Sequence, residues 1–458
     1  MFYIHAVRSL VDYAAPALLT LSPGQWANVE VIQNDALRVI TGAPRWTKIL
    51  NLRLETKLTS IEIRVKGIAA CMLIKILTRP RISSLKDIIT GALTLDRRAS
   101  NSNRWTHSAI NTINTFDITN TVTEKGVDEI HADFVIQAPW ESLPADFKIV
   151  ALEGKKNQTN PHLLHNIAQM HIEANMASDS FTYFTDGSVD QQGQETGAAV
   201  KAGNSANSWR LSNGCSTLQT EMLAIQKALE HALAQHRQHV IIHTDSRTAI
   251  ETLQQEHICD NIHLITNVIS LMQTLKRQGR RVVINWVPSH VGIIGNDIAD
   301  EAANFATKRR NVDIYIPQTL SQIKKVIRNR AMQKMYSDHN TAVATSGSTG
   351  WYKNSTNYEP LSLMKGSSRA TEVHLHRIRL GYPCAWEIGL QVPEDERKCQ
   401  HCGEMPDRPL EHYLTQCTVT NPLRFQLSFN RAEEVVKHIW QNLNKATIQV
   451  INTHTPPK

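Results

Sequence analysis

The chain has 458 residues, of which 41% are hydrophobic, and it carries a formal net charge of +7 at pH 7. A chain of this length can bury a sizeable core and hold roughly two to four domains, which excludes a peptide scaffold. Its seven unevenly spread cysteines do not describe a disulfide framework and favour a reducing, intracellular setting, while the positive charge favours an anionic partner such as nucleic acid.

Residues 1–80 show a helical pattern, with a break at PGQW and apolar residues near every 3.6 positions in VEVIQNDALRVI. Arg8 and Asp12 interrupt the apolar start, so we expect no signal peptide. The apolar window GIAACMLIKIL near residue 70 is shorter than the roughly 20 residues that span a bilayer. We therefore expect a soluble protein without a membrane partner.

Residues 81–177 are predicted to be a linker or connection. The stretch 98–123 is rich in Asn, Ser and Thr, whose side chains compete for backbone hydrogen bonds and favour turns. We therefore expect a loop there and a domain boundary before the compact unit that follows.

Residues 178–310 are predicted to form a compact α/β unit. The order of elements is FTYFTDGS, ETGAAVKAG and NSWRLS as antiparallel strands, then TLQTEMLAIQKALEHALAQ as a helix, HVIIHTDS as a strand, two helices, RRVVINWVPS as a strand and a last helix. This order predicts a mixed five-stranded sheet flanked by helices.

The C-terminal part is predicted to be mainly helical. Residues 311–390 read as a basic helical connector (IKKVIRNRAMQKMY) containing a Ser/Gly/Thr-rich loop, TSGSTGWYKNSTN. Residues 395–420 form a Cys/His segment, and residues 421–458 read as a helix and a disordered polar tail ending in THTPPK.

Two strands of the α/β unit end in aspartate, Asp186 in FTYFTDGS and Asp245 in HVIIHTDS, and adjacent parallel strands would place the two carboxylates side by side. Glu221, on the helix between them, lies within an apolar stripe and so faces the sheet. The stripe consists of Leu218, Met222, Ile225, Leu229 and Leu233. Three converging carboxylates repel one another unless a metal binds them. Alternatively, the aspartates only form turns and Glu221 caps or snorkels locally.

A fourth acid and a histidine follow in WVPSHVGIIGNDIADEAAN. His290 lies in a glycine-containing loop, and Asp300 lies one turn into the last helix, for which Asn296 is the expected N-cap. An imidazole with an ordinary pKa of about 6.5 is suited to proton transfer or to assisting product departure. The alternative is a solvated loop histidine, one of 20 in the chain.

In order and spacing, FTDGS, TEMLAI, HTDS and WVPSHVGIIGNDIADEAAN resemble the four motifs of type 1 ribonuclease H domains. The resemblance implies an endonuclease that hydrolyses the RNA strand of RNA/DNA hybrids with two Mg²⁺ ions, for which Mn²⁺ can substitute. It places His290 as the mobile catalytic-loop histidine and assigns metal binding to Asp186 as the bridging ligand, Glu221, Asp245 and Asp300. By motif position, substrate contacts fall on Gly187, Ser188, Gln219 and Thr220.

Transposases and retroviral integrases share the general sheet, and the gap from Asp186 to Glu221 superficially resembles their acidic spacing. Their glutamate, however, lies on a helix after the strand of the second aspartate. Because Glu221 precedes Asp245, the order favours ribonuclease H.

The segment CQHCGEMPDRPLEHYLTQC contains two closely spaced pairs of candidate zinc ligands, Cys399 with Cys402 and His412 with Cys417. Thiolates and an imidazole in this arrangement are what tetrahedral Zn²⁺ requires, and Gly403 suits a tight turn after the first pair. We expect one structural Zn²⁺. Other candidate ligands are His401, His374 and Cys384, and the alternative is a set of thiols in a surface loop.

The flanks resemble a second family. RSLVDYAAPALL, VIQNDALRVITGAPRWTKILNL and SIEIRVKG, within residues 1–80, resemble the region after the polymerase palm in non-LTR retrotransposon reverse transcriptases, in which a ribonuclease H domain, a basic stretch like HLHRIRLGY and a Cys/His segment can follow. This implies the C-terminal portion of a retroelement polyprotein and nuclear residence. We find no F/Y-x-D-D motif, and HADF at 131–134 is not one, so no polymerase activity is expected.

Two other hypotheses remain from the sequence. The chain is a catalytically silent nucleic-acid-binding remnant that uses the zinc segment and basic flanks, or only residues 178–310 fold well and the N-terminal region is an unfolded remnant. Intact carboxylates argue against the first of these. No protein partner is indicated.

Overall fold

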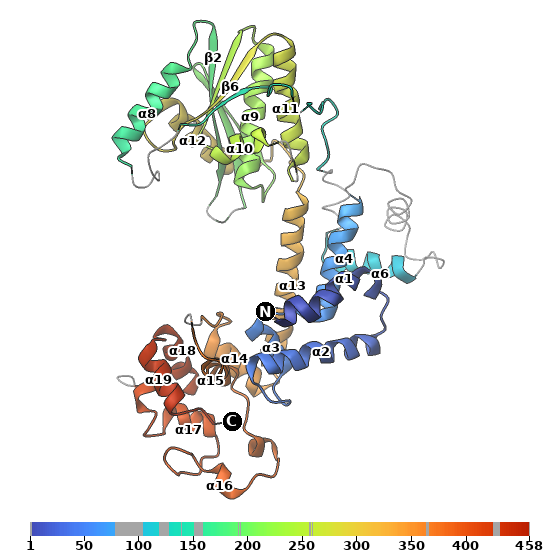
Figure 1. The fold of residues 1–458 in the computed structure, drawn as a ribbon, viewed down its shortest axis with the longest axis vertical. Helices are drawn as coiled ribbons and strands as arrows, with labels where there is room; N and C mark the ends of the chain where they lie inside the picture. The colour runs from blue at the N-terminus through green and yellow to red at the C-terminus, as the bar shows by residue number, and fades with distance from the viewer. Residues whose placement is uncertain are drawn as a thin grey trace. The chain divides into compact units, whose positions relative to one another are not determined.

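The computed structural model of the chain describes residues 2–77, 104–118, 128–138, 140–150, 159–190, 192, 194–255, 258, 260–362, 366–424 and 431–457. The chain divides into two compact units (Figure 1): unit 1 is Met1–Leu73, Ala92–Phe116 and Lys325–Lys458, and unit 2 is Ile74–Gly91 and Asp117–Lys324. Among the helices that are described, none is both long and apolar enough to cross a membrane.

Unit 2 contains a mixed six-stranded sheet with the order β1-β6-β5-β2-β3-β4 (Figure 1). The strands are β1 (Asp146–Lys148), β2 (Ser180–Val189), β3 (Thr196–Ala202), β4 (Ser205–Leu211), β5 (His239–Thr244) and β6 (Arg281–Trp286). β2, β3 and β4 are antiparallel, whereas β2, β5, β6 and β1 pair in parallel. The predicted mixed sheet is confirmed and gains one strand, because the three residues of β1 are too few to show an alternating pattern.

Helices cover both faces of this sheet (Figure 1). They are α8 (Pro161–Ala174), α9 (Thr217–Ala234), α10 (Arg247–Gln254), α11 (Ile262–Arg277) and α12 (Ile294–Thr307). The predicted stripe of α9 is buried in the main core through Met222, Ile225 and Leu229, together with α10 and α11. α8 and α12 pack on the opposite face, where both contact the surroundings of Phe184.

The start of α12 differs from the prediction, because the helix begins at Ile294 with Ile293 as its N-cap residue rather than at Asn296. A Cβ on Gly295 would lie 2.3 Å from atoms of the Phe184 ring, so the first turn packs directly on β2. Asn296 is buried inside that turn. Packing of the first turn, rather than a side-chain cap, therefore sets where the helix begins.

Unit 1 is helical and joins segments that are far apart in the sequence. Its helices are η1 (Tyr3–Arg8, a π-helix), α1 (Ser9–Leu18), α2 (Pro23–Thr41), α3 (Ile49–Thr56), most of α4 (Ile61–Leu77), α6 (Arg104–Thr115), most of α13 (Leu320–Val343), α14 (Gly347–Thr356), α15 (Arg369–Leu380), η3 (Ala385–Ile388), α16 (Glu394–Arg397), α17 (Pro409–Thr415), η4 (Asn421–Leu423), α18 (Ala432–Gln441) and α19 (Lys445–Thr453). One core cluster joins Leu37 and Leu52 to Tyr352 and Leu380. In the part of the chain that the structure describes, residues 2–73 therefore share a core with residues of the 325–457 segment, which supports the hypothesis that the N-terminal region folds.

Two segments predicted to be loops are helices. α6 lies within the Asn/Ser/Thr-rich stretch 98–123, where Ala109 and Ile113 are buried and Trp105 donates to the carbonyl of Pro16 across 2.9 Å. α14 lies within TSGSTGWYKNSTN and buries Tyr352 completely. In both, local composition favours turns, but tertiary burial of apolar residues on one face outweighs it.

Two further segments differ from the sequence prediction. The polar tail predicted to be disordered is described as far as Pro457, whose carbonyl accepts from Arg377 at 2.6 Å, and the carbonyl of His454 accepts from Tyr413 at 2.7 Å. α8 lies in the predicted linker, although Asn160 as N-cap and Pro161 at the first helical position are a recognisable start signal.

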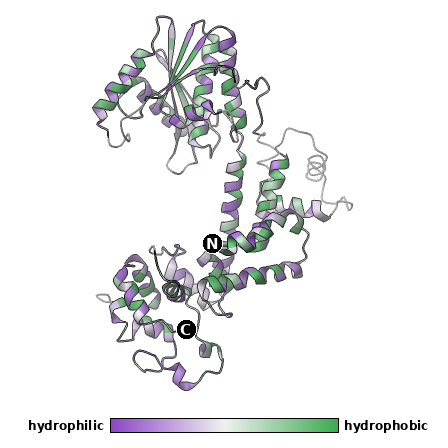
Figure 2. Ribbon diagram, in the orientation of Figure 1, coloured by the Kyte–Doolittle hydropathy of each residue, from purple (hydrophilic) through white to green (hydrophobic). Residues whose placement is uncertain are grey.

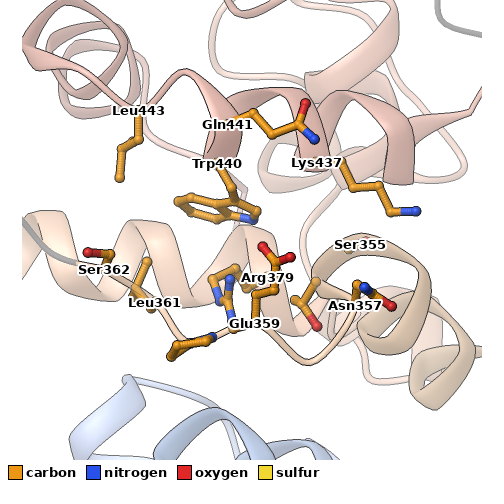
Figure 3. A pocket seen from close by; sticks show the side chains of 12 residues that line it. Ser355, Asn357, Glu359, Leu361, Ser362, Arg379, Lys437, Trp440, Gln441 and Leu443 are labelled. Carbon is orange, nitrogen blue, oxygen red and sulfur yellow. The ribbon is translucent and has the colours of Figure 1, made fainter. Parts of the chain in front are cut away.

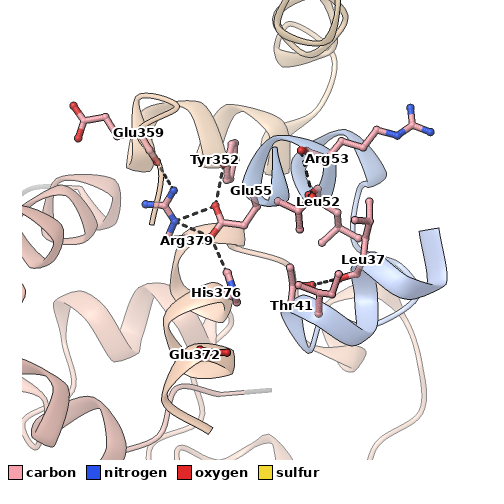
Figure 4. Close-up of polar contacts among 12 residues, drawn as sticks. Leu37, Thr41, Leu52, Arg53, Glu55, Tyr352, Glu359, Glu372, His376 and Arg379 are labelled. Carbon is pink, nitrogen blue, oxygen red and sulfur yellow. Dashed lines mark hydrogen bonds and ion pairs between the residues drawn. The ribbon is translucent and has the colours of Figure 1, made fainter. Parts of the chain in front are cut away.

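A buried charged network ties the N-terminal and C-terminal segments of unit 1 together (Figure 4). Both oxygens of Glu55 accept from Nε of Arg379, at 2.8 and 3.0 Å. His376 Nδ1 lies 2.7 Å from one carboxylate oxygen, and the Tyr352 hydroxyl donates to the other at 3.0 Å. Burial opposes ionisation of Glu55, but His376 and Arg379 hold the pKa of its carboxyl below the ordinary value.

The basic stretch HLHRIRLGY therefore has a structural role that composition did not show. Arg377 and Arg379 are almost fully buried, so the described structure does not present them to phosphate groups. A cavity of about 670 Å³ lies beside Arg379, and Figure 3 shows the side chains that line it. The guanidinium carbon of Arg379 lies 5.2 Å from the centre of the Trp440 ring, which lines the same cavity. Figure 2 shows hydrophobic residues along the strands and on one face of most helices, as amphipathic packing requires.

Candidate active site and metal centre

Asp186 and Asp245 meet because of strand register. β2 and β5 pair in parallel through Thr185 and Thr244, so the residues that follow these two lie side by side. Glu221 reaches the same place from α9, and carboxylate oxygens of the three acids all lie within 4.8 Å of one another. The structure therefore brings together the three acids that the strand and helix patterns singled out.

The glycine after Asp186 is required by the close approach of α9 to β2. A Cβ on Gly187 would lie 2.3 Å from Oγ1 of Thr220 and 2.5 Å from the backbone nitrogen of Glu221. Gly187 also lies within β2, opposite Ala198 of β3, so the Asp-Gly pair does not close a hairpin. Its backbone N–H works against the rise in the pKa of both Asp186 and Glu221.

The electrostatics of the cluster favour a bound cation. Burial and the charges of Asp245 and Asp300 raise the pKa of Asp186 to about 8. Burial is the largest cause that raises the pKa of Glu221 well above its ordinary value, and the charges of Asp186 and Asp245 raise it further. Among the described residues, Oε2 of Glu221 is buried without a hydrogen-bond partner. Hard oxygen donors with an unsatisfied buried oxygen fit a divalent cation such as Mg²⁺.

Asp300 and His290 lie at the edge of this cluster. Asp300, on α12, is not one of the three acids within 4.8 Å, but its charge contributes to the raised pKa of Asp186. Nδ1 of His290 lies 3.9 Å from Oδ2 of Asp300, and its side chain is 73% exposed. An exposed imidazole beside the acids can exchange protons with solvent or substrate.

The predicted substrate contacts are only partly accessible. Gln219 and Thr220 are buried and bonded within the protein: the amide of Gln219 caps α9 through Ser216, and the hydroxyl of Thr220 donates to the carbonyl of Thr217 at 2.7 Å. In this structure the two side chains are therefore buried rather than exposed, and their contact with a substrate stays a prediction. Gly187 and Ser188 are half-buried in β2 and remain candidates.

The Cys/His segment of unit 1 forms a second cluster. One ligand atom from each of Cys399, Cys402, His412 and Cys417 lies within 4.8 Å of all the others. Sγ of Cys402 is 3.2 Å from Nε2 of His412, and the sulfurs of Cys399 and Cys417 are 3.9 Å apart. Gly403, with φ of +79°, makes the tight turn after the first pair. This donor set and its compactness fit tetrahedral Zn²⁺.

Neighbouring groups orient His412 and lower the pKa of Cys399, whereas burial and the nearby thiols raise the pKa of Cys402 to about 11. Nδ1 of His412 lies 3.4 Å from Oε1 of Gln416 and 3.5 Å from the carboxylate of Glu404, which leaves Nε2 to face the thiols. Burial opposes ionisation of Cys399, but the backbone N–H groups of His401 and Cys402 lower the pKa of its thiol overall. The thiolate is the form that binds metal.

The alternative ligands contact other groups. His401 Nε2 lies 3.0 Å from the carbonyl of Thr455, and His374 Nδ1 lies 3.3 Å from Oδ1 of Asn452. The Cys384 sulfur accepts from Arg377 at 3.6 Å. The cluster therefore consists of the four residues whose spacing predicted it.

We expect the purified chain to carry about one zinc per chain, and Cys417→Ser to lower zinc affinity at least about a hundred-fold, because three donors cannot close a tetrahedral site. Metal analysis by mass spectrometry after dialysis measures this. Cys215→Ser, a buried cysteine of unit 2, is the matched control and should leave zinc content unchanged. Equal zinc in the Cys417 variant and the wild type would contradict the assignment.

Residues 178–308 match the family model for RNase H. This segment contains β2 to β6, α9 to α12, and all five residues predicted to be catalytic. Residues 178–308 therefore form an RNase H domain, a domain class that acts on RNA/DNA hybrids. No curated protein matches the chain. α8, β1 and unit 1 lie outside the matched segment.

Proposed function

We propose that the chain is a metal-dependent endonuclease that hydrolyses the RNA strand of RNA/DNA hybrids. The observation that carries this is the cluster of buried Asp186 and Glu221 with half-buried Asp245, within the RNase H domain. Glu221 also has an unsatisfied buried oxygen. Three mutually repelling carboxylates are costly to a fold and are useful where a cation must be held.

In this proposal the four acids would bind the metal ions and His290 would transfer a proton. Asp186, central to the cluster, would bridge two ions, with Glu221 and Asp245 completing one set of ligands and Asp300 supplying the other. When bound, Mg²⁺ or Mn²⁺ supplies an activated water and neutralises charge on the leaving oxygen. His290, exposed and 3.9 Å from Asp300, can move a proton at Nδ1 or Nε2.

We also propose that the chain derives from the C-terminal part of a retroelement polyprotein and acts in the nucleus. Only the resemblance of the flanks to the region after the palm of non-LTR reverse transcriptases supports this origin. The zinc-type cluster of unit 1, in the place where that resemblance expects a Cys/His segment, agrees with it.

The direct test is cleavage of a labelled RNA/DNA hybrid, with double-stranded RNA and double-stranded DNA as controls, in Mg²⁺ and in EDTA. We expect hybrid-only cutting that needs Mg²⁺, and for Glu221→Gln a rate lower by about a hundred-fold or more, because charge stabilisation of several kcal/mol depends on the ion. Cutting in EDTA, or equal cutting of double-stranded DNA, would contradict the proposal.

The second candidate function is nucleic-acid binding without catalysis, which the Cys/His cluster favours. In the same assay, this function would be indicated if the folded wild-type protein binds the hybrid and does not cut it. Because Arg377 and Arg379 are buried, binding by the C-terminal part would depend on other basic residues.

A further inference from the structure

The loop that carries His290 has little of its own to hold the imidazole in place. His290 has φ of +56°, an uncommon backbone conformation for a residue other than glycine, and Gly292 follows with φ of +82°. The His290 side chain is mostly exposed, and its Nδ1 lies 3.9 Å from Oδ2 of Asp300. The position of the imidazole therefore depends on how the backbone from Val287 to Ile293 is held.

α8, which precedes the matched RNase H segment, holds both ends of this loop. Ala168 and Ile172 of α8 form a buried cluster with Val287, just before the loop, and Ile293, just after it. Val291, next to His290, packs against the same cluster. The spacing of Ala168 and Ile172 places them on one face of the helix, so α8 applies a continuous apolar surface to the loop.

A hydrogen bond from α8 reaches the loop itself. Nδ1 of His165 lies 2.9 Å from the backbone oxygen of Val291, and because a carbonyl only accepts, the ring donates through Nδ1–H. The same ring lies 3.5 Å from where a Cβ on Gly292 would be, which is ordinary van der Waals contact. His165 therefore contacts the two residues that directly follow His290.

We propose that His165 is a positioning residue for His290: by donating to the Val291 carbonyl and packing on Gly292, it fixes the loop so that the imidazole stays beside Asp300. The inference rests on the proposed function, since His290 has a catalytic task only if the hybrid is cleaved. It assigns to this chain a loop anchored by α8, where the family resemblance predicts a mobile one.

The test uses the full chain and four substitutions. His165→Leu removes the donor, His165→Asn keeps an amide N–H at a similar distance from the backbone, and His162→Leu makes the same exchange at an exposed position of α8. His290→Ala gives the full loss, roughly a hundred-fold in kcat. Hydrogen exchange of residues 288–293, melting temperature, and kcat and KM for hybrid cleavage in Mg²⁺ are measured for each.

For His165→Leu we expect faster exchange of the Val291, Gly292 and Ile293 amides, a kcat lower by about five- to ten-fold, and an unchanged KM and melting temperature. His165→Asn should restore most of the protection of the loop amides and most of kcat. His162→Leu should match the wild type in both. Unchanged loop exchange in His165→Leu overturns the inference. Faster exchange of the loop amides in His165→Leu, together with a kcat equal to that of the wild type, also overturns the inference.

The two proposals fail separately. If the wild type does not cleave the hybrid, the proposed function fails, while hydrogen exchange still decides whether His165 anchors the loop. If His165→Leu does not fold, His165→Ala removes the donor without adding bulk, and the same comparison with His165→Asn decides the outcome.

Discussion

Asp186→Asn is expected to abolish hybrid cleavage, by about a thousand-fold or more, and at the same time to raise the melting temperature of the metal-free protein at pH 8. The loss of activity follows because the variant removes the central carboxylate of the cluster. The gain in stability follows because burial, together with Asp245 and Asp300, makes the ionised Asp186 unfavourable in the folded state.

The raised pKa of Asp186 makes the stability of the metal-free wild type depend on pH. The folded pKa of Asp186, about 8, lies above its ordinary value of 3.8. Between about pH 4 and pH 8 the folded metal-free protein therefore keeps a proton on Asp186 that the unfolded chain releases. The free energy of unfolding of the wild type consequently falls as the pH rises from about 4 through 8. The advantage of Asp186→Asn over the wild type should grow across the same window, at roughly 2–4 °C per kcal/mol for a domain of this size.

Thermal melts in EDTA between pH 5 and pH 9, and again in Mg²⁺, measure this prediction. Mg²⁺ should stabilise the wild type and should do little for the variant, because ligand binding to the folded state adds to stability. Asp338→Asn, an exposed carboxylate 3.6 Å from Nζ of Lys334, is the control and should change neither series. A lower melting temperature for Asp186→Asn in EDTA at pH 8 would count against the electrostatic account of the site.

Glu55→Gln is expected to lower the free energy of unfolding of unit 1 by about 3–5 kcal/mol, because it leaves the buried guanidinium of Arg379 without its counter-charge. Since the pKa of Glu55 lies below its ordinary value of 4.5, its contribution is present above pH 4.5 and is lost as the pH falls through the lowered value. The free energy of unfolding of wild-type unit 1 should therefore fall as the pH drops below 4.5.

Urea unfolding followed by limited proteolysis, with fragments identified by mass, assigns the loss to unit 1. We expect the Glu55 variant to lose fragments of unit 1 at lower urea than the wild type, while the RNase H domain remains resistant. Glu62→Gln, which removes a half-buried i,i+4 pair with Lys66 on one helix, should cost about 0.5 kcal/mol or less. Adding Arg379→Met to Glu55→Gln should recover part of the loss, and equal effects of Glu55→Gln and Glu62→Gln would refute the network's role.

The RNase H domain was predictable because its signals are local. Asp186 lies near the end of the apolar run in β2 and Asp245 directly follows β5. The apolar stripe on α9 alone shows that Glu221 faces the sheet. The zinc-type cluster was predictable for the same reason, since two closely spaced pairs carry the whole ligand set. α6 and α14 were missed because polar composition does not reveal a face that is buried against a distant segment. α8 was missed although Asn160 and Pro161 mark its start.

By itself, then, the sequence determined the class of the α/β unit and the identity of its acids, because strand and helix periodicities act within a few residues of each side chain. Only the tertiary structure decided what depends on distant pairing. It showed Glu55 neutralising Arg379 more than 300 positions away, which turns a basic stretch into a buried framework. It buried Gln219 and Thr220, and it brought His165 to the loop of His290, because each of these depends on packing between elements that no local pattern encodes.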